Sequence, residues 1–319
     1  MKQRIITGLI MLAIILPVVV MPNTNRFFFI VFQILMALMV LIGTFEMIRM
    51  YEKKRPLSIP FKITIMVLTL ITYLNFGNYW KFENQLFPVL DLRINQMALL
   101  VFSVTVLLGV FVFDKKTTGE DIGKAILIMF YVGLGSASIA VLKTLGVRFI
   151  IYVILIATLT DMFAYFVGIA IGKHKMAPHI SPKKSWEGAI GGTIVATIIA
   201  SSFAIFYGEI FTSTGFLGNI FNPSDFVTIF DEFSSLRDPQ YDTVRPIIIV
   251  AITLLGSVAA QIGDLVASKL KRHYEIKDFG NLFPGHGGVL DRFDSILFIS
   301  LLFVGIFLTI QQVFPILGM

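Results

Sequence analysis

A dense set of polar side chains lies in the last fifth of the sequence, from Gln261 to Ser295. Gln261, Asp264, Ser268 and Lys271 follow one another at i, i+3, i+7 and i+10, which places all four on one face of a helix. Such a face could hold a cation and an anion side by side. This spacing therefore makes Asp264 and Lys271 candidates for binding a metal ion and a phosphate.

A second polar group follows the sequence Pro-Gly-His-Gly-Gly at 284–288. Its glycines allow left-handed backbone angles and close approach of a ligand, and a turn of this kind can present amide groups to an anion. Asp291, Asp294 and Ser295 then share one face at the start of the next helix. A helix amino terminus favours carboxylates, so capping is an alternative explanation for Asp294.

Asp264 and Asp291 are the predicted metal ligands. Two carboxylates in a chain without cysteine favour Mg²⁺ over Zn²⁺. A magnesium ion surrounded by Lys, Arg and His side chains is typical of phosphoryl or nucleotidyl transfer. The chain has no GxxxxGK[ST] motif, which excludes an ordinary nucleotide-hydrolysing motor.

Asp161 is an acid within an otherwise apolar stretch, and it shares a helix face with Tyr165, Gly168 and Gly172. A carboxylate at that depth is costly, so it usually has a partner cation, a bound metal or a place in a proton pathway. A hydrogen bond between helices that only shapes the bundle is the alternative.

The segment 173–188 contains four lysines and two histidines. Lys183, Lys184 and Ser185 lie at a predicted helix start, and ammonium groups beside a helix amino terminus favour phosphate. For the segment as a whole, a topological anchor on the cytoplasmic side is a strong competing explanation. For these three residues we favour phosphate binding.

The composition shows what must position these groups. Of 319 residues 56% are apolar and only 14% are charged, with a mean hydropathy of +0.84, whereas soluble domains carry about 25% charged residues. We therefore expect an all-α polytopic integral membrane protein. Segments long enough to span a bilayer predict about nine transmembrane helices, with cores at 5–21, 27–48, 61–76, 96–113, 122–142, 148–171, 187–207, 246–267 and 291–314.

The distribution of Lys and Arg predicts the orientation. With nine spans, 19 of the 26 basic residues fall on the side of the amino terminus, which is then cytoplasmic, with the carboxyl terminus external. The longest external loop is 208–245. Its apolar residues Phe226, Ile229, Phe230, Phe233 and Leu236 have helical spacing and predict a short helix on the membrane surface.

The chain shows no composition break and no repeat of 20 to 50 residues. We therefore divide the chain only by how much diagnostic sequence each part contains. Residues 1–145 are amino-terminal transmembrane helices with little diagnostic sequence, and residues 146–319 form a carboxyl-terminal catalytic region with cytoplasmic loops 172–186 and 268–292.

The run from Ser268 to Asp294 resembles the signature of phosphatidate cytidylyltransferases, also called CDP-diacylglycerol synthases. It reads Ser-Lys-Leu-Lys-Arg at 268–272, Lys277-Asp278, and Pro-Gly-His-Gly-Gly-Val-Leu-Asp-Arg-Phe-Asp at 284–294. Matches at 161–165, 181–188 and 263–265 support it. The resemblance covers the carboxyl-terminal half well, whereas up to about residue 145 the chain resembles the family only in being hydrophobic.

The resemblance implies that CTP and phosphatidic acid give CDP-diacylglycerol and pyrophosphate, as a step of phospholipid biosynthesis in the plasma membrane. It implies a Mg²⁺ or Mn²⁺ ion, with a monovalent cation as a further option, a homodimer, a cytoplasmic active site and no nucleic acid partner. We assign catalytic roles to Asp264, Asp291, Lys271 and Lys184, with the metal on Asp264 and Asp291. The predicted substrate-binding residues are Asp161, Lys183, Ser185, Ser268, Arg272, His286, Gly287, Gly288 and Arg292.

One position departs from the family pattern, because Ala267 stands where relatives commonly have Glu before the Ser of the eighth-helix motif. Two other functions remain open. A CTP-dependent lipid kinase would use a similar metal site, and a secondary transporter would share the polytopic architecture.

Overall fold

The computed structural model describes residues 13–21, 25–77 and 94–313, and it is almost entirely helical. Eight helical stretches in this part of the chain are long and apolar enough to cross a membrane. They are α2 (Arg26–Tyr51), α3 (Ile59–Gly77), α4 (Gln96–Phe113), the continuous run Gly119–Leu145, α7 (Val147–Ile171), α8 (Trp186–Ile205), α11 (Val244–His273) and α12 (Leu290–Val313).

Each of these eight stretches coincides with a predicted span, which confirms the all-α polytopic membrane fold. The first predicted span, 5–21, lies partly outside the described residues, and its described part is helical over residues 13–20. The run Gly119–Leu145 differs from expectation in one respect. It consists of α5 (Gly119–Ile128), a π-helical turn η2 (Met129–Leu134) and α6 (Gly135–Leu145), and π-helical turns are rare and often found at functional sites.

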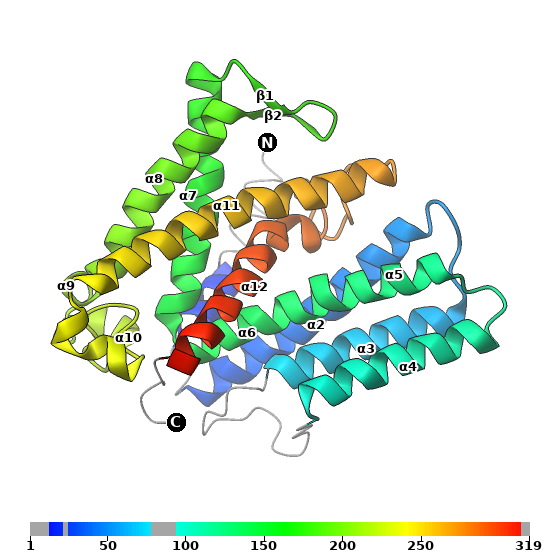
Figure 1. The fold of residues 1–319 in the computed structure, drawn as a ribbon, viewed down its shortest axis with the longest axis horizontal. Helices are drawn as coiled ribbons and strands as arrows, with labels where there is room; N and C mark the ends of the chain where they lie inside the picture. The colour runs from blue at the N-terminus through cyan, green and yellow to red at the C-terminus, as the bar shows by residue number, and fades with distance from the viewer. Residues whose placement is uncertain (1–12, 22–24, 78–93, 314–319) are drawn as a thin grey trace.

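The helices form two groups (Figure 1). Helices α2, α3, α4 and α5 lie side by side in one group, while α7 and α8 form a pair in the other, with α11 crossing beside them and α12 packed against α11. Two buried apolar clusters correspond to these groups. Apolar side chains also remain exposed on many helix surfaces, as expected where lipid is the solvent.

Glycines allow α7 and α8 to approach closely. A Cβ on Gly188 would lie 2.5 Å from the Ala164 carbonyl oxygen, and one on Gly192 would lie 2.7 Å from the Ala164 nitrogen. Small residues at such an interface are typical of membrane helix pairs. The segment before α8 is a two-stranded antiparallel hairpin of β1 (Lys175–Ala177) and β2 (Ser181–Ser185).

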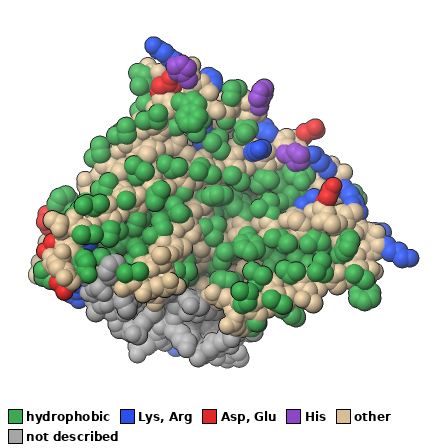
Figure 2. All heavy atoms as spheres, viewed as in Figure 1, with side chains coloured by type: hydrophobic (Ala, Val, Ile, Leu, Met, Phe, Trp, Pro, Cys, Tyr) green, Lys and Arg blue, Asp and Glu red, His purple; other side chains and the backbone are tan. Residues whose placement is uncertain are grey.

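Contacts between loops support the predicted grouping of loops by membrane side. At one end of the bundle, Lys54 Nζ lies 2.9 Å from His273 Nε2, and Arg55 donates to Thr118 Oγ1 at 3.1 Å. At the other end, Arg148 pairs with Glu232 at 2.6 Å. Figure 2 shows Lys, Arg and His side chains along the rim formed by the hairpin and the nearby helix ends, and Asp and Glu side chains at the far edge beside α9 (Tyr207–Ile210) and α10 (Gly218–Phe221).

The prediction of an amphipathic surface helix around Phe226–Leu236 was wrong. Residues 226–233 form turns, followed by the short 3₁₀ helices η3 (Ser234–Arg237) and η4 (Pro239–Tyr241). Phe230, Phe233 and Leu236 are fully buried in the second apolar cluster. The Asn222 side chain bonds the backbone of Phe211 and Phe226, so side-chain hydrogen bonds stabilise the turns in place of a helical ladder.

Candidate active site

A polar cavity of about 260 Å³ opens between α7, β2, α8 and α11. It collects residues that the sequence places far apart. The residues that line it are Asp161, Ala164, Tyr165, Ser181, Lys183, Lys184, Ser185, Ala189, Gln261 and Asp264. Five of the predicted site residues therefore share one cavity.

Asp264 and Lys184 form the charged wall of this cavity. Lys184 Nζ lies 2.5 Å from Asp264 Oδ2, and the two side chains keep 22% and 28% of their surface exposed. Ser268 donates to Asp264 Oδ1 from the next helical turn at 3.5 Å. Because the pair is only partly covered, an incoming ligand can reach both charges.

The start of α8 positions Lys183 and Lys184. Ser185 is the amino-terminal cap of α8, and its hydroxyl accepts a hydrogen bond from the Gly188 amide at 3.2 Å. The Gln261 amide group donates to Ala189 O at 3.1 Å and to Thr193 Oγ1 at 2.7 Å, which fixes α11 against α8. The Ser185 cap and the hydrogen bonds of Gln261 hold the two walls of the cavity together.

Asp291 is held differently. Its Oδ1 accepts from Lys271 Nζ at 2.7 Å, and its Oδ2 accepts from the amides of Phe279 and Gly288 at 2.8 and 2.9 Å. The Asp291 side chain is only 3% exposed. Both oxygens are therefore engaged within the protein and covered, whereas the Asp264 side chain keeps 28% of its surface exposed.

The backbone amides of the Pro-Gly-His-Gly-Gly turn are also occupied. His286 N and Gly287 N both donate to Phe283 O, at 2.9 and 3.1 Å, and Gly288 N donates to Asp291. Gly287 has a φ of +87°, and a Cβ there would lie 2.8 Å from Asp291 Oδ2. The glycines of this turn thus make room for a carboxylate of the protein, and the Gly288 amide donates to it.

Glu46 of α2 is a residue that the sequence analysis missed. Its carboxylate accepts from Val289 N at 2.9 Å and from Leu290 N at 3.0 Å, and the residue is 4% exposed. A Cβ added at Gly288 or Gly280 would collide with Glu46 Oε1. The signal was present in the sequence, because Glu46 is the single carboxylate in the 26 residues of α2.

Asp294 lies near the same site and interacts electrostatically with Asp264, Lys271 and Asp161. Tyr131, from the π-helical turn, is 4% exposed and interacts with Asp264, Asp291 and Asp294. Its hydroxyl is buried and has no hydrogen-bond partner within the described part of the chain. The sequence analysis did not identify Tyr131, because nothing in an apolar stretch signals a π-helical turn.

The donor set fits a divalent ion. Around the site, the carboxylates of Asp161, Asp264, Asp291 and Asp294 lie near the ammonium groups of Lys184 and Lys271, and Lys183 lines the same cavity as Asp161 and Asp264. No three His, Asp or Glu side chains converge on one point in the ranges that the structure describes. Magnesium sites commonly use one or two carboxylates and leave the other positions to water and substrate phosphates.

Three further predicted residues, Arg272, His286 and Arg292, do not line the polar cavity. Arg272 makes only long contacts, from Nε to Ile180 O at 3.5 Å and from a terminal nitrogen to Ile276 O at 3.4 Å. His286 is half-buried, and its Nδ1 has no hydrogen-bond partner within the described residues. Arg292 is exposed. Ala267 is fully buried in the first apolar cluster, so the position where relatives commonly have Glu faces the protein interior.

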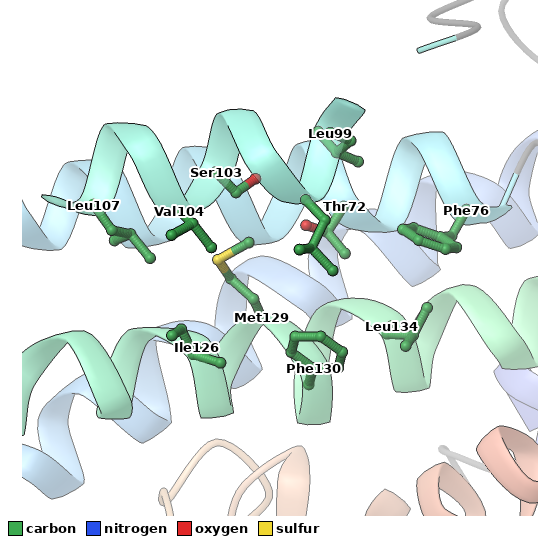
Figure 3. A pocket seen from close by; sticks show the side chains of 11 residues that line it. Thr72, Phe76, Leu99, Ser103, Val104, Leu107, Ile126, Met129, Phe130 and Leu134 are labelled. Carbon is green, nitrogen blue, oxygen red and sulfur yellow. The ribbon is translucent and has the colours of Figure 1, made fainter. Parts of the chain in front are cut away.

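A second cavity, of about 230 Å³, lies between α3, α4 and the run that contains η2. Ser103, Val104 and Leu107 of α4 face Met129 and Phe130 of η2 across it (Figure 3). Its lining contains no charged side chain. A triphosphate needs charged partners, which this lining lacks, and we take the polar cavity as the candidate active site.

Comparisons with known proteins identify the family of this chain. The model of the Cytidylyltransferase family matches residues 2–310. Phosphatidate cytidylyltransferase of Bacillus subtilis is 34% identical over 303 residues, which cover 94% of both chains. The proteins of the same name from Staphylococcus haemolyticus and Staphylococcus aureus are each 30% identical over 299 residues, covering 94% of this chain and 96% of theirs.

The fold and the site define a multi-pass membrane enzyme of the nucleotidyltransferase class. The chain belongs to the cytidylyltransferase family, and the resemblance inferred from its carboxyl-terminal signature is confirmed. The similarity extends over nearly the whole chain. The amino-terminal half therefore also matches the family, whereas its sequence alone resembled the family only in being hydrophobic.

Proposed function

We propose that this protein transfers the cytidylyl group of CTP to phosphatidic acid, giving CDP-diacylglycerol and pyrophosphate. A phosphate oxygen of the lipid attacks the α-phosphorus of CTP, a new phosphorus–oxygen bond forms, and the bond to pyrophosphate breaks. The attacking phosphate is ionised at neutral pH, so no general base is required.

The observation that carries this proposal is the cavity that joins Asp264, Lys184, Lys183 and Ser185. Its ammonium groups and the amino terminus of α8 suit phosphate oxygens, while Asp264 suits a cation. Phosphoryl and nucleotidyl transfer depend mainly on positioning and charge neutralisation, and this cavity provides groups for both. Tyr131 interacts electrostatically with Asp264, Asp291 and Asp294, and its buried hydroxyl has no hydrogen-bond partner among the described residues.

Enzymes of this family generally use a divalent metal ion. We propose Mg²⁺, with Mn²⁺ as a substitute, held by Asp264 and Asp291. When bound, the ion would neutralise charge on the triphosphate and polarise its phosphorus–oxygen bonds. In the protein, Lys271 orients the Asp291 carboxylate through their 2.7 Å ion pair.

Substrates labelled at different phosphates test the reaction. With CTP labelled at the α-phosphate, purified protein in detergent with phosphatidic acid and Mg²⁺ should place the label in the lipid and release one pyrophosphate per lipid product. With CTP labelled at the γ-phosphate, the label should appear in pyrophosphate only. Transfer of the γ label to lipid would identify a lipid kinase, and absence of both products would favour transport.

We also propose that the polar cavity faces the cytoplasm and that the protein is a homodimer in the plasma membrane. The side of the bundle with the cavity carries the loops rich in Lys and Arg, which are typically cytoplasmic. Labelling of single cysteines introduced at Lys175 and at Asp238 in intact and opened cells would test the orientation. Light scattering in detergent would test the dimer, with a monomer mass contradicting it.

A further inference from the structure

Glu46, in the amino-terminal half of the chain, contacts the residues around the start of α12, in the carboxyl-terminal half. Its two oxygens each accept one amide, from Val289 and Leu290, at 2.9 and 3.0 Å. The first amides of a helix have no partner within the helix. Glu46 therefore caps α12 from a different helix, 243 residues earlier in the sequence.

Two glycines leave space for the Glu46 carboxylate. Gly280 and Gly288 approach Glu46 so closely that a Cβ at either position would collide with Oε1. Asp291 fastens the same segment from the other side, through the amides of Phe279 and Gly288. The two carboxylates together fix the segment 279–291.

The burial of Glu46 and its charged neighbours indicate a role beyond that of a simple helix cap. Glu46 is 4% exposed, and Asp291, which repels it, is among its charged neighbours together with Arg49. A buried carboxylate near a second carboxylate is costly, and the amides of Val289 and Leu290 together with Arg49 offset part of that cost. What Glu46 adds is two acceptors at fixed spacing, which define where α12 begins and how it is rotated.

We propose that Glu46 is a positioning residue for the active site, a role that rests on the proposed cytidylyl transfer. By holding the amides of Val289 and Leu290, it sets the rotation of the first turns of α12. That rotation decides where Asp291 and Asp294 lie relative to Asp264. The amino-terminal half of the chain thus contributes to catalysis through the placement of acids that it does not itself carry.

Hydrogen–deuterium exchange of the full-length protein in detergent, without substrate or metal, tests the contact. Replacing Glu46 with Gln keeps the side-chain shape and removes one acceptor, so exchange of the amides in 286–292 should accelerate about 10-fold or more. Glu52→Gln is the matched control. Glu52 lies at the same end of α2, but it accepts from Leu57 N and Lys62 Nζ, so exchange in 286–292 should stay at the wild-type rate.

Kinetics test the positioning role. Because misplacement of catalytic groups by about 1 Å can cost 100-fold, kcat should fall about 10-fold in Glu46→Gln and about 100-fold in Glu46→Ala. The KM for CTP should change less than about threefold, because the groups that line the polar cavity remain in place. Glu52→Gln should keep both constants within about twofold of wild type.

A double-mutant cycle with Gly280 isolates the contact. Gly280→Ala should displace the Glu46 carboxylate and lower kcat about 10-fold, but should cost less than about twofold in the Glu46→Ala background. Unchanged exchange in 286–292 or an unchanged kcat in Glu46→Gln would overturn the inference, as would additive effects in the cycle. If wild-type protein fails to form CDP-lipid, the proposed function fails, while the exchange experiment still tests the contact.

Discussion

The two ends of the helix bundle both contain ion pairs, yet they differ in what surrounds them. At the end opposite the polar cavity, Arg148 pairs with Glu232 at 2.6 Å and Arg245 with Asp231 at 3.0 Å. Arg148 also stacks on Phe226, 3.7 Å from the ring centre. These pairs are covered by aromatic side chains of the second apolar cluster.

At the cavity end, Lys184 and Asp264 form a pair that stays partly open, and further carboxylates stand nearby. The covered pairs are largely buried, which suits a role in stabilising the fold. The open pair borders a cavity that Asp161 and Lys183 also line, so a cation and phosphates can reach it. Ion pairs by themselves therefore do not mark the active site, whereas an open pair beside a polar cavity does.

The largest effect is expected for Asp264→Asn. This change removes the exposed carboxylate that we propose as a metal ligand, and CDP-lipid formation should fall by about 1,000-fold or more. Membrane insertion and yield should match the wild type, because the side chain is partly exposed. Asp242→Asn at the opposite end is the control, since Asp242 is 68% exposed and pairs only with Arg245. Normal rates in Asp264→Asn would remove the metal hypothesis.

Asp291→Asn should lose both activity and stability. Its carboxylate is buried and bonds Lys271 and two amides, so the change leaves a poorly paired ammonium group behind. Breaking a buried pair costs about 3–5 kcal/mol, and a lower unfolding temperature in detergent should accompany the loss of turnover. A variant with wild-type stability would show that the interactions of Asp291 in this structure contribute little.

Arg148→Met tests the covered end. The substitution leaves Glu232 buried without its partner and should destabilise the protein by about 3 kcal/mol. The KM for CTP of the folded protein should stay unchanged, because Arg148 lies at the opposite end of the bundle from the cavity. A raised KM without a loss of thermal stability would contradict the contrast between the two ends.

Lys184→Ala should have the smallest effect of the four. It removes one ammonium group from the cavity and should raise the KM for CTP or for phosphatidic acid about 10-fold. Lys175→Ala is the matched control, because Lys175 is exposed on the first strand of the same hairpin. If the KM values of Lys184→Ala equal those of the wild type, the hairpin serves only as a topological anchor.

The sequence predicted the spans well because each is a long apolar stretch, and length and hydropathy alone decide whether a helix can cross a bilayer. It also predicted residues that the structure brings together in the polar cavity, such as Lys184 and Asp264. Both lie near helix ends that the same pattern places on one membrane side. Local spacing was sufficient for these predictions.

The sequence could not predict contacts between distant helices. The contact of Glu46 with Leu290 spans 244 positions, and no local pattern connects them. For the segment 226–236, the local pattern predicted an amphipathic helix that the structure does not contain. Its helical spacing was real, but Asn222 and Asp231 hold it in turns through side-chain hydrogen bonds to the backbone, and tertiary burial of its aromatic residues prevailed over periodicity.

Binding of Mn²⁺ in the presence of CTP, followed by electron paramagnetic resonance, tests the central claim most directly. Wild-type protein and Asp242→Asn should bind the ion with the same affinity, and Asp264→Asn should bind it at least about 10-fold more weakly. Equal affinity in Asp264→Asn and wild type would contradict the assignment of the cavity as the metal-nucleotide site.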